Sequence, residues 1–447
     1  MVIDNFQLEG QEYYQEWQRC GRPDCWCMKS LNRQHGPYWY VHDLATEERR
    51  YIGKRLPAAV LVARTARVTL LPQISASLVR LRAMEQALSR LDRCEALTPP
   101  ERLTLATCGF GAALVGGCPP EIDQEGQTLE LDSLHAADLH GIDLCGIDLR
   151  GIDMRLVNLS ASNLADAQLV GTKLSWADLT QSNLSRANFR LADLSLADLQ
   201  GAVLREANLT RSDLRWSNLS ESDLSGANLT ECDLGEADLT HADLHLAVLC
   251  RAQLAEANLC AAKLTACDLR DARLNGAVLR EAELDVADLR RAELCWADLT
   301  KADLRWADLG EAALTEADLS DANLSEADLR QANLCRANLR QAVLRLADMH
   351  GCDLRGAQLR RADLSLAQLN GARLNSADLT GACLSEAYLV GADLSGARLS
   401  GADLRWADLS EATLSGADLE GAHVSAEQLA RTNGRHNITV LDGSTTH

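Results

Sequence analysis

Three cysteines and a histidine near the start of the chain could hold a metal ion. Cys20, Cys25 and Cys27 lie within eight residues, and His35 and His42 follow closely. Thiolates and imidazoles are the ligands that tetrahedral zinc prefers, so the three cysteines and His35 are candidate ligands of a Cys3His site. The spacing C-x4-C-x-C is not that of a standard zinc finger or ribbon. Two alternatives stay open: a compact β-hairpin whose thiols bind no metal, and a redox-active cluster.

No sequence signature of a common catalytic site accompanies these cysteines. The chain contains no P-loop, no G-x-G-x-x-G after a strand pattern, no G-x-S-x-G and no H-E-x-x-H. The ten histidines are scattered, and the acidic residues are spread too evenly to single out a general acid and base. We therefore predict that the protein is not an enzyme, and that zinc is its one candidate cofactor.

The cysteines lie in an aromatic-rich segment, residues 1–56, that we predict to be a small β module. Its second half alternates like a pair of strands, with WYVHD (39–43) and RRYIG (49–53) on either side of a polar turn. The module resembles a small uncharacterised bacterial domain with the pattern CG-x-x-x-C-x-C, HGPYWY and Y-I/V-G-K. That resemblance implies no activity.

Residues 57–120 are predicted to be helical. Apolar residues recur every three or four positions from Ile74 to Leu91, and arginines surround them. Pro72 separates this helix from a preceding one, and Thr98-Pro-Pro-Glu101 is a capping-box start for a third. The arginines could contact nucleic acid, or the helices could pair within the chain or across a homodimer. We expect a small α+β domain whose apolar end covers the region that follows.

A five-residue repeat fills the chain from Leu129 to Leu429. Every fifth residue is leucine at all but four of 61 positions, and the exceptions are also apolar: Met154, Phe189, Met349 and Val424. The residue two positions earlier is small, usually alanine, and Asp or Asn usually stands between the two. The unit reads A-(D/N)-L-x-x over a predicted domain at 121–430, and residues 431–447 are predicted to be a C-terminal cap and tail.

A period of five fits neither regular element of secondary structure. On an α-helix, leucines five residues apart would be rotated by about 140° from one to the next. On a straight strand, an odd period would send successive leucines to opposite faces. The chain can keep every leucine on one side only if it turns a corner in each unit, so the repeat predicts an all-β solenoid with a dry central stack.

The repeat resembles the pentapeptide-repeat family through motifs such as WADLT (176–180), GANLT (226–230), EADLS (316–320) and GADLS (391–395). The resemblance implies a right-handed quadrilateral β-helix with four pentapeptides per square coil. The leucine and the small residue would face inward, and the other three positions outward. Some members of this family are acidic rods that mimic duplex DNA and bind DNA gyrase, which they protect from toxins and quinolone drugs.

The charge of the chain supports such mimicry only in part. The net charge is −20, and residues 1–120 contain 15 Lys+Arg against 12 Asp+Glu, so the remainder carries −23. The repeat predicts about 15 coils and a rod of roughly 70 Å. That is about one charge per 3 Å, roughly half the charge density of duplex DNA. Some aspartates should instead bond to backbone N–H groups at the corners.

The opening residues lack the basic and apolar regions of a secretory signal, and no stretch is apolar and long enough to span a bilayer. We therefore expect a cytoplasmic protein that has no membrane partner.

The predicted coil also maps tryptophans onto the surface, because residues 20 apart should stack. Trp176, Trp216 and Trp296 share one face, and Trp306 and Trp406 share the opposite one. Exposed indoles favour a partner surface, although an indole can also lie across neighbouring coils.

We predict a protein-interaction scaffold, a rigid acidic rod with an unidentified protein partner. The alternative is a DNA-mimicking regulator of gyrase or another DNA-binding protein. In neither case does the rod bind nucleic acid directly.

Overall fold

The structure is a computed structural model, and it describes residues 2–8, 11–18, 35–43, 49–53 and 134–434. The chain divides into two compact units, 1–122 and 123–447, which are treated separately. The predicted helices at 57–120 and the tail beyond residue 434 lie outside the described residues. Within the described residues, no helix combines the length and the apolar character needed to cross a membrane.

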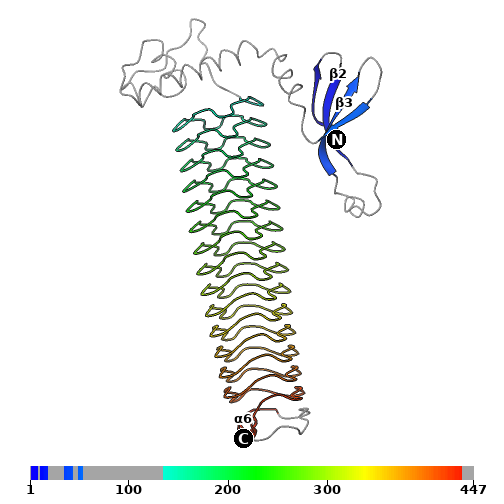
Figure 1. Cartoon of the computed structure of the whole chain (residues 1–447), viewed down its shortest axis with the longest axis vertical. Coiled ribbons are helices and arrows are strands. Elements are labelled where there is room, and N and C mark those ends of the chain that lie inside the picture. Colours follow the sequence, from blue (N-terminus) through cyan, green and yellow to red (C-terminus); the bar gives the residue numbers. More distant parts are fainter. Residues whose placement is uncertain (1, 9–10, 19–34, 44–48, 54–133, 435–447) are drawn as a thin grey trace, which may run out of the picture. The chain divides into compact units, whose positions relative to one another are not determined.

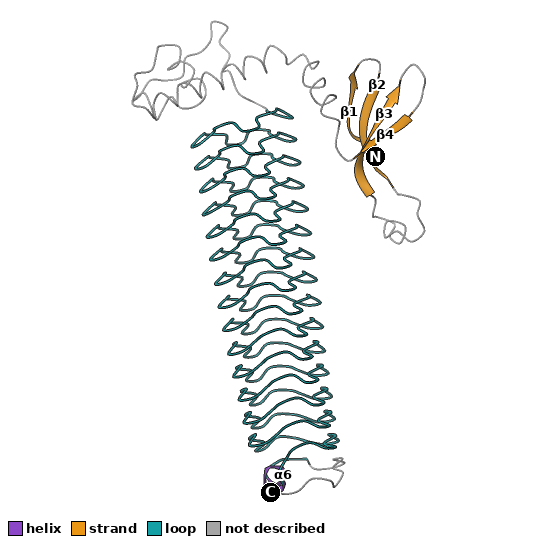
Figure 2. Cartoon of the chain, in the orientation of Figure 1, coloured by secondary structure: helices purple, strands orange, loops and turns teal. Residues whose placement is uncertain are grey.

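The N-terminal unit contains a four-stranded antiparallel sheet in the order β1-β2-β3-β4 (Figure 2). The strands are β1 (Val2–Leu8), β2 (Gln11–Gln18), β3 (His35–Asp43) and β4 (Arg49–Gly53). β3 and β4 pair antiparallel, in agreement with the predicted strand pair. β1 and β2 are additional to that pair.

The second unit is a stack of four-sided coils (Figure 1). Parallel bridges join residues 20 apart, from Asp138 with Asn158 to Thr413 with Asn433. The N–H of Leu139 donates to the carbonyl of Asn158 at 2.7 Å, and the N–H of Asn158 donates to the carbonyl of Ala137 at 2.9 Å. Each coil therefore contains four pentapeptides, as the family resemblance implies, and residues 20 apart stack at the β-strand spacing of ~4.8 Å.

The interior of the coil is a column of leucines lined by small residues. The repeat centres from Leu134 to Leu419 are all buried, including the larger Phe189 and the methionines. Serine at a small position stays satisfied, because the hydroxyl of Ser182 donates to the carbonyl of Leu179 at 2.7 Å. Among the described residues, no buried side-chain nitrogen or oxygen lacks a hydrogen-bond partner. The predicted inward and outward positions are thereby confirmed over this range.

Each corner is a tight turn that begins at the central leucine. The N–H of Ile142 donates to the carbonyl of Leu139, and only the third residue of the turn, Gly141, has a positive φ. This is the pattern of a type II turn. The third position suits glycine, yet side chains as large as Trp406 (φ +59°) occupy it elsewhere. The rod therefore tolerates local backbone strain at many corners.

We expect Val286→Asn to stabilise the rod by about 1 kcal/mol, because asparagine tolerates positive φ better than a β-branched residue does. Val286 has φ +60° and a side chain that is 55% exposed, so little packing is lost. A second substitution, Gly391→Val, places a β-branched residue at a corner that now has glycine. No atom lies within 4 Å of the new Cβ, so this substitution should destabilise the rod by a similar amount through backbone strain alone. Chemical denaturation followed by circular dichroism measures both changes, and equal stability of all three proteins would contradict strained corners.

The regular coil ends at a short helix, α6 (Ala426–Ala430). Ser425 and Gln428 form its capping box, as the sequence pattern suggests. The side-chain amide of Gln428 also donates to the carbonyls of Leu404 and Ala407, at 2.7 and 2.8 Å. The helix replaces one side of the last coil, so the centres Val424 and Leu429 are only half-buried.

Candidate interaction surface

The candidate zinc ligands fall largely outside the described residues. Cys20, Cys25 and Cys27 lie between β2 and β3, and His35 is the first residue of β3, where only the backbone is described. Gln18 and His35, which bound this segment, are register partners. Within the described residues, no three His, Cys, Asp or Glu side chains come together in a way that could hold a metal ion. The zinc site stays a prediction.

On the rod, the aspartates and asparagines that precede the leucines bond first to their own corners. Oδ1 of Asp178 accepts the N–H of Thr180 at 3.1 Å and its hydroxyl at 2.7 Å. The same bond from residue i+2 recurs at many other units. Asparagines also donate down the stack, as Asn258 does to Asp238 at 3.2 Å. The predicted use of Asp at corners is confirmed, and many carboxylates are therefore only partly available to a partner.

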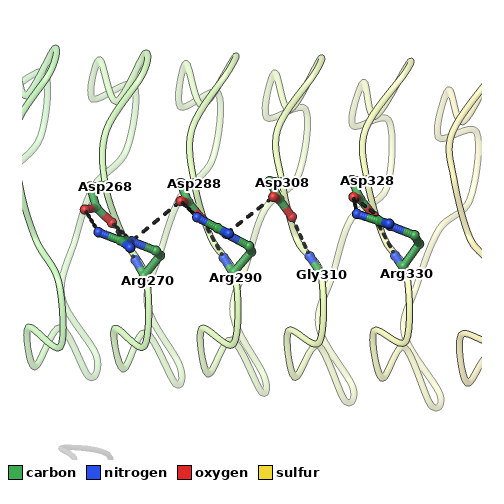
Figure 3. A network of polar contacts seen from close by, with 8 residues as sticks. All are labelled: Asp268, Arg270, Asp288, Arg290, Asp308, Gly310, Asp328 and Arg330. Carbon is green, nitrogen blue, oxygen red and sulfur yellow. Dashed lines mark hydrogen bonds and ion pairs between the residues drawn. The ribbon is translucent and has the colours of Figure 1, made fainter.

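Arginines neutralise the longest row of stacked aspartates, which is shown in Figure 3. Arg270 bonds Asp268 at 2.6 Å and comes within 3.6 Å of Asp288. Arg290 bonds Asp288 at 2.5 Å and lies 3.4 Å from Asp308. Each guanidinium thus bridges two coils, which lowers the repulsion between stacked carboxylates.

One rung of this ladder is missing, because Gly310 stands where the coils on either side have arginine (Figure 3). Its N–H donates to Asp308 at 3.0 Å. The ladder resumes with Arg330, which bonds Asp328 at 2.5 Å.

Removing Arg270 should make the protein more sensitive to acid. The Arg270 side chain lowers the pKa of Asp268 from 3.8 to about 2. A carboxylate with a lowered folded-state pKa contributes stability above its unfolded pKa, and this contribution is lost as pH falls from about 3.8 through about 2. In Arg270→Gln we expect the pKa of Asp268 to rise towards 3.8 and the acid-unfolding midpoint to move to higher pH.

The pair is partly exposed, so we expect a stability difference at neutral pH of no more than about 1 kcal/mol. NMR titration of Asp268 and acid denaturation measure the two effects, with the remote Arg190→Gln as control. An unchanged Asp268 pKa in Arg270→Gln would show that the ion pair does not form.

All five candidate tryptophans occupy the third position of a corner turn, with positive φ. Trp216, Trp296, Trp306 and Trp406 are 46%, 64%, 50% and 74% exposed, whereas Trp176 is half-buried. Because residues 20 apart stack, Trp176, Trp216 and Trp296 lie at one corner. Trp306 and Trp406 lie at the opposite corner.

These corners carry further apolar side chains, which form two ridges. The long ridge stacks at one corner over residues 246–406, and Glu326 and Glu386 interrupt it; its apolar members are Leu246, Ala266, Val286, Trp306, Leu346, Leu366 and Trp406. The short ridge stacks at the opposite corner in consecutive coils and consists of Leu156, Trp176, Leu196 and Trp216. Sequence reasoning identified the tryptophans but missed the aliphatic residues between them, which reading every twentieth residue would have found.

A recurring motif, D-L-R-W, supports three of the exposed indoles. In residues 303–306, Arg305 bonds Asp303 at 2.5 Å and its guanidinium lies 5.3 Å from the ring centre of Trp306. The motifs at 213–216 and 403–406 repeat the arrangement, with guanidinium to ring distances of 5.1 and 5.6 Å. Cation–π contact of this kind restrains the indole on the surface. The three repeated tetrapeptides were a readable signal that the sequence analysis did not use.

One of the two corners between the ridges is charged over six successive coils, residues 211–311. Its residues there alternate in sign, and Glu231 pairs with Arg211 at 2.6 Å and with Arg251 at 2.8 Å. Arg291 pairs with Asp271 at 2.7 Å. The corners of the rod therefore differ in chemistry although they share one backbone geometry.

Comparison with known proteins places this architecture. The family model for pentapeptide repeats (8 copies) matches overlapping stretches that together cover residues 137–425. A model for a domain of unknown function (DUF6788) matches residues 3–61. No curated protein matches the chain.

Several solved structures are similar. HetL, a pentapeptide repeat protein involved in heterocyst differentiation regulation from the cyanobacterium Nostoc, is 39% identical over 51% of this chain and 90% of its own, with a TM-score of 0.26. A pentapeptide repeat protein from the Arabidopsis thaliana thylakoid lumen is 34% identical over 23% of this chain and 71% of its own, with a TM-score of 0.23. QnrB1, a plasmid-mediated fluoroquinolone resistance protein, is 17% identical over 41% of this chain and 86% of its own, with a TM-score of 0.30.

The family model spans more than half of the chain, and its repeat has the same frame as the buried leucines and the bridges between residues 20 apart. The chain therefore belongs to the pentapeptide-repeat family, whose fold is the right-handed quadrilateral β-helix.

Proposed function

We propose that the protein is a non-enzymatic scaffold that binds another protein along the long ridge. The observation that carries this proposal is the stack of apolar side chains at one corner from Leu246 to Trp406, of which five are exposed: Leu246, Val286, Trp306, Leu346 and Trp406. Covering an exposed apolar side chain with a partner contributes about 25 cal/mol of binding free energy for each Å² removed from water.

Folding alone gives no reason for these residues. The third position of each turn has positive φ and points outward, so glycine or asparagine is locally the better choice. Trp306 (φ +58°) and Trp406 (φ +59°) instead combine an unfavourable backbone with an exposed indole. A residue type that costs stability at its own position is better explained by binding than by folding.

The surroundings of the ridge define the partner. Glu326 and Glu386 lie within the ridge itself, neither forms an ion pair among the described residues, and the rod as a whole is acidic. A complementary protein has an apolar groove with a rim of lysine and arginine, because charged rims steer association. The ridge is convex, so the groove belongs to the partner.

A pull-down with the full chain tests the proposal. The wild type should retain a specific protein, and Trp306→Ser/Trp406→Ser should reduce its recovery at least about tenfold, the loss expected when central aromatic contacts are removed. A matched control, Trp216→Ser/Trp296→Ser, alters the opposite corner and should retain the partner. Equal recovery by all three proteins would contradict binding at the long ridge. Sedimentation of the same variants shows whether the occupant is instead a second copy of the chain, the homodimer considered above.

The alternative, mimicry of DNA towards gyrase, has one favourable observation. Five aspartates stack in consecutive coils, at positions 268, 288, 308, 328 and 348. Arg270, Arg290 and Arg330 pair with this row, which reduces its field and places the alternative second. A salt-sensitive inhibition of gyrase supercoiling by the purified protein would favour mimicry over the scaffold, and no inhibition at micromolar protein would exclude it.

A further inference from the structure

The electrostatics of the rod follow a simple rule within its five-residue units. Where arginine directly follows a central leucine and aspartate directly precedes it, the two side chains pair, as Arg355 and Asp353 do at 2.6 Å. This D-L-R pairing recurs at Arg150, Arg155, Arg215, Arg270, Arg290, Arg305, Arg330, Arg355 and Arg405. Other arginines pair with a carboxylate of an adjacent coil, as Arg186 does with Asp166 and Arg280 with Asp298, so most guanidiniums on the described rod are supplied with a carboxylate.

Six arginines follow a centre that no aspartate precedes: Arg190, Arg205, Arg280, Arg340, Arg345 and Arg360. Only two of these units, at Arg340 and Arg360, are stacked on each other. They read Asn338-Leu-Arg340 and Gln358-Leu-Arg360, so a neutral amide stands where the rule has aspartate. Neither Arg340 nor Arg361 forms an ion pair within the described part of the chain. Arg360 has only a distant one, 3.9 Å from Asp378.

These side chains line an open hollow of about 240 Å³, whose walls are Arg340, Gln341, Arg360 and Arg361. Arg340 stacks below Arg360, and Gln341 stacks below Arg361, because each pair is 20 residues apart. The amide nitrogen of Gln341 is held by Asp321 at 2.7 Å, which fixes one wall of the hollow. The surrounding coils, residues 331–370, contain six arginines and three aspartates in a chain whose net charge is −20.

We propose that this hollow, the arginine hollow, binds a small anion of the phosphate class that carries at least two phosphoryl groups. Guanidinium is always charged and presents a planar fork of N–H donors that matches phosphate oxygens. Three such forks from two adjacent coils can serve several oxygens at once, whereas a single carboxylate engages one fork. The hollow is larger than a single phosphate and open to solvent, so the rest of an organic diphosphate can extend outward.

Isothermal titration calorimetry of the full chain with inorganic pyrophosphate tests the site at low salt. We expect saturable binding of one pyrophosphate, and affinity at least about tenfold weaker in Arg360→Gln/Arg361→Gln, because charge-assisted bidentate bonds are lost. The control Arg190→Gln/Arg345→Gln removes the same charge from two exposed arginines outside the hollow and should change the affinity less than about twofold. All four positions face outward, and thermal melts check that both variants stay folded.

A second variant tests the missing carboxylates directly. Asn338→Asp/Gln358→Asp restores the D-L-R rule while it keeps every arginine, so Arg340 and Arg360 each gain an internal partner, only Arg361 stays without one, and pyrophosphate should bind at least about tenfold more weakly. Orthophosphate and citrate distinguish the ligand class, and both should bind more weakly than pyrophosphate. The proposal is overturned if the wild type shows no saturable binding at millimolar pyrophosphate, if the control double variant loses as much affinity as the hollow variant, or if citrate binds as tightly.

Discussion

Leu299→Asp is expected to destabilise the rod by about 5 kcal/mol, the largest effect of any single change considered. Leu299 is completely buried in the leucine column. Its replacement removes aliphatic volume and places a carboxyl group where only hydrocarbon surrounds it, so the cavity and the unpaired polar group both cost free energy. Each coil contacts mainly its two neighbours, and the rod should therefore open first at this coil.

Chemical denaturation gives the overall loss, and hydrogen exchange locates it in the coils around residue 299. Gln331→Asp is the matched control, because it adds the same carboxyl group at an exposed corner position with positive φ, which aspartate tolerates. Its cost should stay within about 0.5 kcal/mol. If the two variants melt together, the assignment of inward and outward positions is wrong. Glu316→Lys is a poorer control, because Glu316 accepts from Trp296 at 3.1 Å and pairs with Arg336 at 3.3 Å.

Gln428→Leu is expected to lower the free energy of opening of the last coil by about 3 kcal/mol, the second largest effect. The Gln428 side chain donates to two backbone carbonyls and accepts the N–H of Ser425 at 2.8 Å. Leucine keeps most of the side-chain volume but leaves the two carbonyls and the N–H of Ser425 without a hydrogen-bond partner. Each of these groups that water does not reach costs about 1–3 kcal/mol of stability. The open end of a solenoid has no further coil to compensate for the loss.

Hydrogen exchange should show the loss of protection within residues 404–433 and leave the middle of the rod unchanged. The control is Glu427→Gln, the neighbouring residue, whose side chain is 79% exposed and pairs with Arg431 on the helix surface. Its effect should be about 0.3 kcal/mol. If the amides of the last coil are equally protected from hydrogen exchange in Gln428→Leu and in the wild type, the Gln428 side chain does not cap the rod.

The five-residue period by itself determined the part of the structure that depends on geometry alone. It predicted that the chain turns a corner in each unit and that Leu299 and Phe189 face inward. This prediction succeeds because neither a helix nor a straight strand keeps every fifth side chain on one side. The stacking of residues 20 apart, and with it the corner shared by Trp306 and Trp406, came from the resemblance to the pentapeptide-repeat family.

The tertiary structure alone decided which polar groups of different units meet. Asp268 can bond its own corner, the guanidinium of Arg270 or the coil above, and these choices differ by about 1 kcal/mol or less. The role of Gln428 likewise depends on carbonyls more than 20 residues away in the chain. Periodicity carries no information about such side-chain contacts, which is why the ion pairs between coils, the bonds of Gln428 to the preceding coil and the arginine hollow emerge only when the coils are stacked.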